Sequence, residues 1–303
     1  MQICDCSLGY GNTGLPTCIE LFKVTKRIIL VPTYQSDGVT RNKIASGDTL
    51  NASYFSVLVN QSDESKRWYP LPVLDNVEQE RADPLTFETS DGKSIPIEEG
   101  VRTFTCQILE APAEYKKKLD QWGCQSVSYY AIDKQGNLMG SSDGTDLYPI
   151  EIDEKTFFSR FVYATDGTLQ SLQLSFTVSD IENDGDLKMI SKSETGTNLL
   201  KLDGILDVNA SSASESTTGF VLTQTLDYGT YPTPLPVTGW AKDDYTLYNE
   251  TAAASIVITS VTESTTLSGV YTFVYPAVTP GDILTLTASK SGFDFPSTTI
   301  TTP

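Results

Sequence analysis

The stretch YTFVYPAVTPGDILTLTA, residues 271–288, decides the fold class of the last third of the chain. Tyr271–Tyr275 and Asp282–Ala288 alternate polar and apolar side chains, which is the period of a strand with one buried face. Pro280 and Gly281 lie between these segments and are typical turn residues. The pattern predicts two short strands separated by a turn.

Segments of the same kind surround this stretch. Short β-prone segments occur at Thr218–Thr223, Tyr245–Tyr248, Ser255–Thr262 and Ser297–Thr302. About six or seven short strands at roughly ten-residue spacing are typical of a two-sheet sandwich. We therefore expect residues 205–303 to form an immunoglobulin-like β-sandwich.

A resemblance supports this expectation. The segments SGVYTF (268–273), PGDILTL (280–286) and KSGF (290–293) resemble the late strands of bacterial and phage immunoglobulin-like domains. In that family a Gly-x-Tyr leads into one strand and a Gly-Asp turn leads into the next. The resemblance implies a fold and leaves function open, because such domains are fused to adhesins, secreted enzymes and virion proteins alike.

A change in composition predicts a domain boundary near residue 204. Residues 1–204 hold 30 acidic and 19 basic side chains, whereas residues 205–303 hold 9 and 2, with no cysteine or methionine. The segment DVNASSASES, residues 207–216, has the small polar composition of a flexible linker. We therefore expect one domain over 1–204 and a second over 205–303.

The first domain also reads as mainly β. Predicted strands are 48–60, 86–88, 101–109, 126–132, 157–163 and 169–178. One helix is predicted at about 112–122, since Pro112 suits an opening turn and Gly123 follows the end. Residues 61–96 contain several prolines and are interpreted as one long loop, and long loops in compact domains are usually functional.

The net charge and the absence of histidine argue against several classes of function. The net charge is −18 and the chain has no histidine. Such a surface disfavours nucleic acid and anionic lipid, and the absent imidazole removes Ser-His-Asp and Cys-His catalysis. No apolar stretch approaches the ~20 residues of a membrane span, and no secretory signal is recognised. We expect a soluble product made in a cytosol, with no enzyme activity, cofactor or membrane insertion.

The segment GYGNTG, residues 9–14, matches the spacing of a dinucleotide-binding loop. That motif needs a buried strand before it and a helix after it, and neither flank is present. We interpret residues 1–18 as a glycine-rich arm that contains Cys4, Cys6 and Cys18. The cysteine spacing fits no zinc motif, and a four-cysteine site would need Cys106 or Cys124 to be brought in by the fold. Free thiols are the leading interpretation, and a disulfide stays open for a protein outside the cell.

One loop partly matches a calcium-binding pattern. Asp180, Glu182 and Asp184 occupy the first, third and fifth positions of a calcium-loop pattern, and Gly185 occupies the sixth. The twelfth position holds Ser191 where a bidentate glutamate is needed, and no helices are predicted on either side. These three residues are the weak calcium candidates, and no metal is expected.

Taken together, an acidic β protein with one helix, an arm, a long loop and an immunoglobulin-like domain resembles the major tail (tail tube) protein of long-tailed bacteriophages. The resemblance implies a two-sheet sandwich or half-barrel that assembles into six-membered, stacked rings. It also implies partners among other tail and neck proteins, passage of DNA without specific binding, and a virion tail assembled in the host cytoplasm. The C-terminal domain would face outward.

Particular residues follow from this resemblance. The arm, with Cys4, Cys6 and Cys18, and the long loop at 61–96, with Trp68 and Tyr69, become candidates for contacts between subunits. Trp240, Tyr245 and Tyr248 become candidates for weak binding of host-surface glycans, although core packing explains each of them as well.

Two other classes stay open. A capsid decoration or neck protein would share the acidic balance and the immunoglobulin-like fusion but would not form hexamers. A surface adhesin or carbohydrate-binding module would need an export route.

Overall fold

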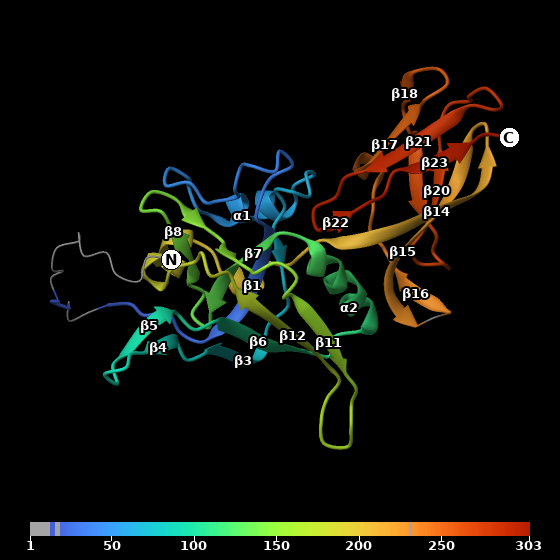
Figure 1. The fold of residues 1–303 in the computed structure, drawn as a ribbon. Coiled ribbons are helices and arrows are strands. Elements are labelled where there is room, and N and C mark those ends of the chain that lie inside the picture. The colour runs from blue at the N-terminus through green and yellow to red at the C-terminus, as the bar shows by residue number, and fades with distance from the viewer. Residues whose placement is uncertain (1–12, 16–18, 231) are drawn as a thin grey trace. The chain divides into compact units, whose positions relative to one another are not determined.

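The computed structural model describes residues 13–15, 19–230 and 232–303. The chain forms two compact units, Met1–Gly204 and Ile205–Pro303 (Figure 1). Both units consist mainly of antiparallel strands, which confirms the mainly-β prediction.

Two main sheets and a separate two-stranded hairpin form the described part of the first unit, and the two main sheets match the predicted two-sheet architecture. Sheet 1 has the order β13-β8-β7-β1-β2, with β9 and β10 attached at its side. Its strands are β1 (Thr25–Pro32), β2 (Tyr69–Pro70), β7 (Val127–Asp133), β8 (Leu138–Ser142), β9 (Leu147–Tyr148), β10 (Ile150–Glu151) and β13 (Leu187–Ile190). Sheet 2 has the order β11-β12-β6-β3, with β3 (Asp75–Arg81), β6 (Arg102–Leu109), β11 (Phe158–Val162) and β12 (Ser171–Val178).

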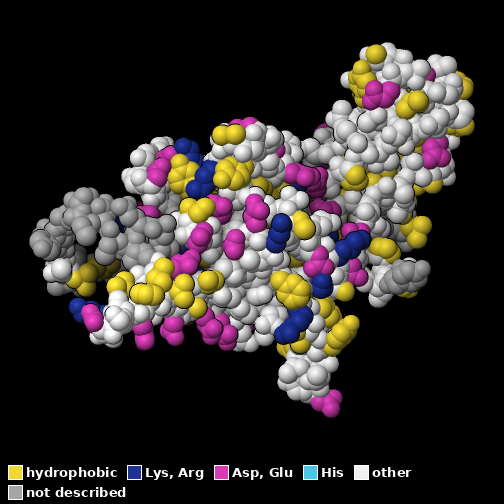
Figure 2. All heavy atoms as spheres, in the orientation of Figure 1, with side chains coloured by type: hydrophobic (Ala, Val, Ile, Leu, Met, Phe, Trp, Pro, Cys, Tyr) yellow, Lys and Arg dark blue, Asp and Glu magenta, His cyan; other side chains and the backbone are white. Residues whose placement is uncertain are grey.

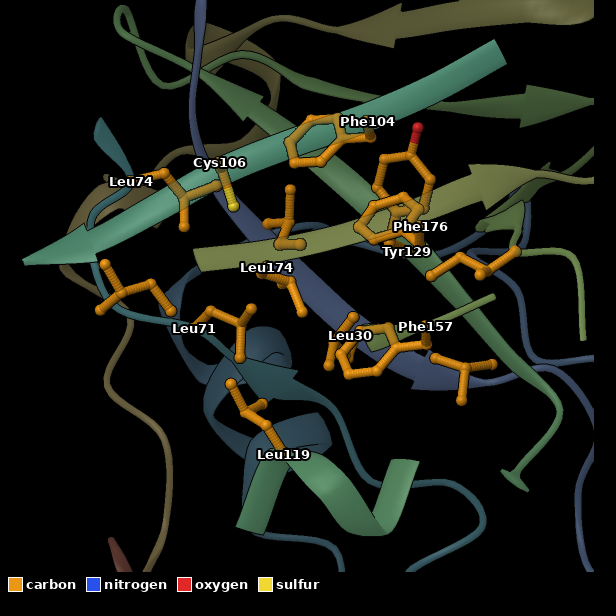
Figure 3. Packing of buried hydrophobic residues seen from close by; sticks show 14 of the residues in the cluster. Leu30, Leu71, Leu74, Phe104, Cys106, Leu119, Tyr129, Phe157, Leu174 and Phe176 are labelled. Carbon is orange, nitrogen blue, oxygen red and sulfur yellow. The ribbon is translucent and has the colours of Figure 1, made fainter. Parts of the chain in front are cut away.

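The core lies between these sheets (Figure 3). Every second residue of β6 and β12 points inward, so Phe104 and Phe176 stack with ring centroids 4.8 Å apart. Leu30 of β1 and Tyr129 of β7 meet them from sheet 1. The strict alternation in β6 and β12 leaves a polar set of side chains on the opposite side of sheet 2.

A helix and a tryptophan cover the outer side of sheet 1. Helix α1 (Ala52–Val59) buries Phe55 and Val59, and Trp68 lies between Phe55 and Tyr130, with ring centroids at 5.9 and 4.8 Å. The predicted strand at 48–60 is therefore wrong. The Asn51 side chain accepts a hydrogen bond from the Tyr54 N–H, and this N-cap starts a helix in a segment of strand-like composition.

The predicted helix near 112–122 is confirmed. It comprises α2 (Ala113–Asp120) followed by a 3₁₀ turn (Gln121–Cys124), and Leu119 of α2 is buried in the core. The expectation of a single helix is wrong, because the described residues also contain α1 and the short α3 (Lys192–Thr195). Three further 3₁₀ turns lie at Asp184–Asp186, Leu199–Lys201 and Lys242–Asp244.

The interpretation of 61–96 as one irregular loop is also wrong. This segment contains β2, β3 and a separate two-stranded hairpin of β4 (Leu85–Glu88) and β5 (Ser94–Glu98). Gly92, with a φ of 75°, turns the chain between β4 and β5. Pro96 fits because an edge strand can lack an N–H on its open side.

The second unit is a two-sheet sandwich. Sheet 3 has the order β19-β20-β15-β14-β22 with β16 attached, and sheet 4 has the order β18-β17-β21-β23. The bounds are β14 (Leu206–Ser216), β15 (Gly219–Thr230), β16 (Thr233–Pro236), β17 (Tyr245–Asn249), β18 (Ala254–Ile256), β19 (Ser260–Glu263), β20 (Val270–Val274), β21 (Ile283–Ala288), β22 (Phe293–Asp294) and β23 (Thr298–Thr301). Strands β20 and β21, predicted from the opening stretch, lie on opposite sheets.

Two boundaries in this unit differ from expectation. The segment 207–216 is part of strand β14 instead of a linker, because it pairs with the apolar strand β15 along most of its length. The predicted single strand Ser255–Thr262 divides into β18 on sheet 4 and β19 on sheet 3. Local composition identified the β character here but not the pairing partners.

A crowded glycine in sheet 1 gives a first prediction. A Cβ on Gly140 would lie 2.4 Å from the Tyr148 carbonyl oxygen and 2.9 Å from the Tyr130 ring. We expect Gly140→Ala to lower the free energy of unfolding by about 1–3 kcal/mol, since packed interiors resist added volume. Urea titration of the wild-type protein and of Gly140→Ala measures the difference in the free energy of unfolding. Gly167→Ala, where nothing lies within 4 Å, is the control and should cost much less.

Candidate assembly surface

The outer side of sheet 2 is mainly polar, and we call its polar residues the polar face. Phe158 and Val162 of β11 and Leu109 of β6 lie on the same side. Register places Glu78 and Glu80 of β3 opposite Thr105 and Thr103 of β6 on this side. The polar face comprises Glu78, Glu80, Thr103, Thr105, Gln107, Arg160, Gln173, Ser175 and Thr177. Nothing among the described residues covers it in the way that α1 and Trp68 cover sheet 1.

Sheet 2 also ends in two open edges. In the described part of the chain, β3 pairs only with β6, and β11 pairs only with β12. Each edge strand therefore presents unpaired backbone N–H and C=O groups, which can template pairing with another chain.

The β4–β5 hairpin carries a second unusual surface. Leu85, Phe87, Ile95 and Ile97 are 58%, 59%, 51% and 47% exposed. Phe87 is paired directly with Ile95, while a register shift beyond Thr86 brings Leu85 opposite Glu98, next to Ile97. We call the four exposed side chains Leu85, Phe87, Ile95 and Ile97 the apolar hairpin face. Figure 2 shows hydrophobic side chains gathered over this hairpin.

The base of this hairpin is held closely to sheet 2. Ala82 N–H donates to the Val101 carbonyl at 2.9 Å, and a Cβ on Gly100 would lie only 1.7 Å from the Ala82 oxygen. Arg81 forms ion pairs with both Glu99 and Asp184. The hairpin therefore continues the β3–β6 pair and is anchored at its neck.

Two of the three calcium candidates, Glu182 and Asp184, form ion pairs with arginines. Asp184 accepts from Arg81 and, at 2.5 Å, from Arg102 Nη1. Glu182 is buried, accepts from the Glu151 N–H at 3.0 Å, and lies 3.7 Å from Arg41 Nη2.

Asp180 is exposed, and the described residues contain no group of three or more potential metal ligands. Glu182 and Asp184 are thus paired with different arginines, and the three candidate carboxylates do not form a metal site. Burial raises the pKa of the neighbouring Glu151 carboxyl, and the charge of Arg41 opposes that shift.

The predicted inter-subunit aromatics have other roles. Trp68 is 2% exposed and packs against Phe55 and Tyr130 inside its own unit, so its assignment to a subunit contact is wrong. Tyr69 is half-buried, and its ring meets that of Trp122 edge-on at 4.7 Å.

The predicted arm cysteines, Cys4, Cys6 and Cys18, lie outside the described residues. Of the two cysteines that the structure describes, Cys124 is exposed and Cys106 is a core residue. Burial raises the pKa of the Cys106 thiol to about 12, which keeps this thiol protonated and inert.

The predicted surface aromatics of the second unit also divide. Trp240 and Tyr245 are buried and form part of the sandwich core, where their ring centroids are 5.4 Å apart. Their assignment to glycan binding is therefore wrong. Tyr248 is half-buried and lies on the outer side of sheet 4, paired with Thr285.

A cavity of about 500 Å³ lies beside Arg41, Lys43 and Tyr148 in the first unit. Lys43 Nζ lies 2.6 Å from an Asp146 carboxylate oxygen, and Arg41 Nη2 lies 3.4 Å from a Glu151 carboxylate oxygen, while Arg41 Nε is buried without a hydrogen-bond partner. The residues that line this cavity include no nucleophile with an adjacent base.

Sequence analysis missed the residues that form the apolar hairpin face. The pattern Leu85-x-Phe87 and Ile95-x-Ile97 around the turn at Gly92 is the signal that could have identified them. Prolines at 84 and 96 favoured a loop interpretation instead.

Comparison with known proteins identifies no relative: no family model, curated protein or solved structure matches this chain. Among the described residues, no helix has the length and apolar character needed to cross a membrane.

Proposed function

We propose that this protein is a virion structural protein that self-assembles into stacked hexameric rings, forming the tail tube of a long-tailed bacteriophage. The apolar hairpin face carries this proposal. An isolated two-stranded hairpin is marginally stable in water, and this one exposes four large apolar side chains on one side. Such a surface is typical of a protein–protein contact. In a self-assembling protein, the partner of this surface is another copy of the chain.

The polar face supports the conduit part of the proposal. Its middle is made of hydroxyl and amide side chains, and Glu78 and Glu80 add negative charge along β3. A wall of this kind repels phosphates and offers few cationic contacts, so DNA can pass without being held. The net charge of −18 acts in the same direction.

The remaining roles follow from the same proposal. Other tail and neck proteins would contact the ends of the tube, and the particle would be assembled in the host cytoplasm. The second unit would face outward from the tube. A capsid decoration or neck protein is the alternative, because it would also use an exposed apolar hairpin.

Negative-stain electron microscopy of the purified protein at rising concentration tests the proposal. We expect rings or hollow tubes on the order of a hundred ångströms across, the size that six ~200-residue domains around a pore would have. Analytical ultracentrifugation of the same samples gives the number of copies. Trimers, or monomers at every concentration, would contradict the tube and favour the decoration or neck alternative.

Glycan binding by the second unit is a second candidate function. Strands β17, β18, β21 and β23 contain no charged residue, and the Tyr248 ring lies on their outer side beside Thr285. A neutral sugar could stack on the ring and bond to neighbouring hydroxyls. We expect Tyr248→Ala to abolish any signal on a glycan array. Tyr163→Ala, which alters an exposed tyrosine of the first unit, should leave that signal unchanged.

A further inference from the structure

The last segment of the first unit, residues 198–204, packs against sheet 1, and we call it the junction segment. It contains the 3₁₀ turn Leu199–Lys201, and the Leu199 side chain is fully buried. Gly204 lies close to β2, because a Cβ on this glycine would be 3.2 Å from the Pro70 carbonyl oxygen. The first unit is therefore packed up to its last residue.

Arg27 of β1 contacts the junction segment from sheet 1. Its guanidinium donates from Nε to the Leu71 carbonyl at 2.5 Å and from Nη1 to the Leu200 carbonyl at 2.7 Å. Arg27 Nη2 also lies 4.0 Å from an Asp203 carboxylate oxygen. Arg27 is only 5% exposed. One buried side chain thus joins β1, the residue that follows β2 and the junction segment.

The hydrogen bond to Leu200 holds the junction segment more strongly than the ion pair does. The Asp203 side chain is 94% exposed and lies at the limit of an ion-pair distance, so solvent weakens its attraction for Arg27. A hydrogen bond from a charged donor is stronger than one between neutral groups. Release of the segment would also leave a buried charged donor without its acceptor, which carries a desolvation cost.

The second unit begins immediately after the junction segment. Within that unit the Leu206 N–H donates to the Gly292 carbonyl at 2.9 Å. Ile205 is therefore the one residue between the Gly204 contact in the first unit and this hydrogen bond in the second. If the junction segment left sheet 1, the connection between the two packed units would lengthen from Ile205 alone to residues 198–205.

We infer that Arg27 holds the junction segment closed, which keeps the connection to the second unit short and protects the peptide bond after Lys201 from proteases. Lys201 is exposed, and its N–H and that of Leu202 both donate within the 3₁₀ turn. Proteases cut segments that open locally. Opening would let a trypsin-like protease cut after Lys201 and release residues 202–303, which contain the second unit. The inference concerns a single chain and does not depend on assembly.

Burial of Leu199 is the alternative explanation for the closed segment. The two explanations predict different results for a variant of Arg27. If the buried leucine suffices, loss of the guanidinium leaves local opening of the turn unchanged. If Arg27 holds the segment, the same loss increases local opening while Leu199 is intact.

Hydrogen exchange of the full chain, read by mass spectrometry, decides between them. We expect Arg27→Met to speed exchange of the Lys201 and Leu202 amides by about tenfold, and trypsin cleavage after Lys201 by a similar factor, because a charged hydrogen bond is lost. Arg27→Lys keeps the charge without the two-pronged guanidinium, so its rates should be intermediate. Lys26→Met is the matched control: Lys26 is the neighbour on β1, pairs with Asp75, and should leave both rates unchanged.

Exchange in β7, which pairs with β1, separates local opening from a general loss of stability. Faster exchange confined to the 3₁₀ turn, with release of residues 202–303, would support the role of Arg27. Unchanged rates in Arg27→Met would overturn it. If Arg27→Met loosened β7 and the turn equally, Arg27→Lys would decide: a rise confined to the turn supports the inference, and an equal rise in β7 overturns it.

Discussion

Replacing Phe87 and Ile95 together with serine is expected to abolish assembly while both units stay folded. The two side chains are paired across β4 and β5 and are each more than half exposed, so the isolated chain gains little from them. Burial against a second copy would remove their apolar surface from water. Losing that burial costs about 2 kcal/mol per contact, or roughly thirtyfold in affinity. Each copy in a ring makes such contacts on more than one side, so the effect multiplies.

Sedimentation velocity across a concentration series measures this loss, and circular dichroism checks the fold. The matched control changes the other side of the same hairpin, with Thr86→Ser and Glu88→Ser. This control should assemble as the wild-type protein does. Equal assembly of the Phe87 and Ile95 variant would show that the apolar hairpin face is not an interface.

Replacing Trp68 or Trp240 with alanine is expected to destabilise one unit strongly and spare the other. Trp68 fills the space between α1 and sheet 1, and Trp240 lies among Tyr245, Phe293 and Phe295 in the sandwich core. Truncation of a buried tryptophan leaves a cavity and costs about 3–5 kcal/mol, which is a large fraction of a domain's stability. The two residues lie in separate compact units.

Differential scanning calorimetry of the two variants measures the effect, and each variant is the control for the other. Trp68→Ala should lower the transition of the first unit, and Trp240→Ala should lower that of the second. If Trp240→Ala left both transitions unchanged, the side chain would not be a core residue, and its assignment to ligand binding would return.

Much of the fold could be predicted from sequence because strands with one buried face alternate. This pattern identified β6, β12, β20 and β21, each of which has a core on one side only. The pattern failed where a neighbour decides the structure. Strand β14 is small and polar, and it is a strand because β15 pairs with it.

Helix α1 shows a different limit. The segment ASYFSVLV favours a strand by composition, but Phe55 and Val59 are four residues apart and share one helix face. The side chain of Asn51 was the available start signal, and the β-branched and aromatic residues outweighed it in the sequence analysis.

The candidate surface was only partly predictable, because the sequence does not show whether an aromatic side chain is buried in the core or exposed to solvent. Trp68 and Trp240 have the composition of contact residues and are core residues. Arg160 and the two glutamates at 78 and 80 carry no motif at all. They share one face only because of the sheet order, which places residues about eighty positions apart at opposite edges of sheet 2.

The arginines around Asp184 have a consequence for how the hairpin is secured. A calcium loop can be emptied, because its ion exchanges with the medium and a chelator removes it. The guanidinium groups of Arg81 and Arg102 belong to the chain and stay charged at any physiological pH. The neck of the hairpin is therefore held by positive charges that are covalently part of the chain. Its attachment does not depend on the calcium concentration.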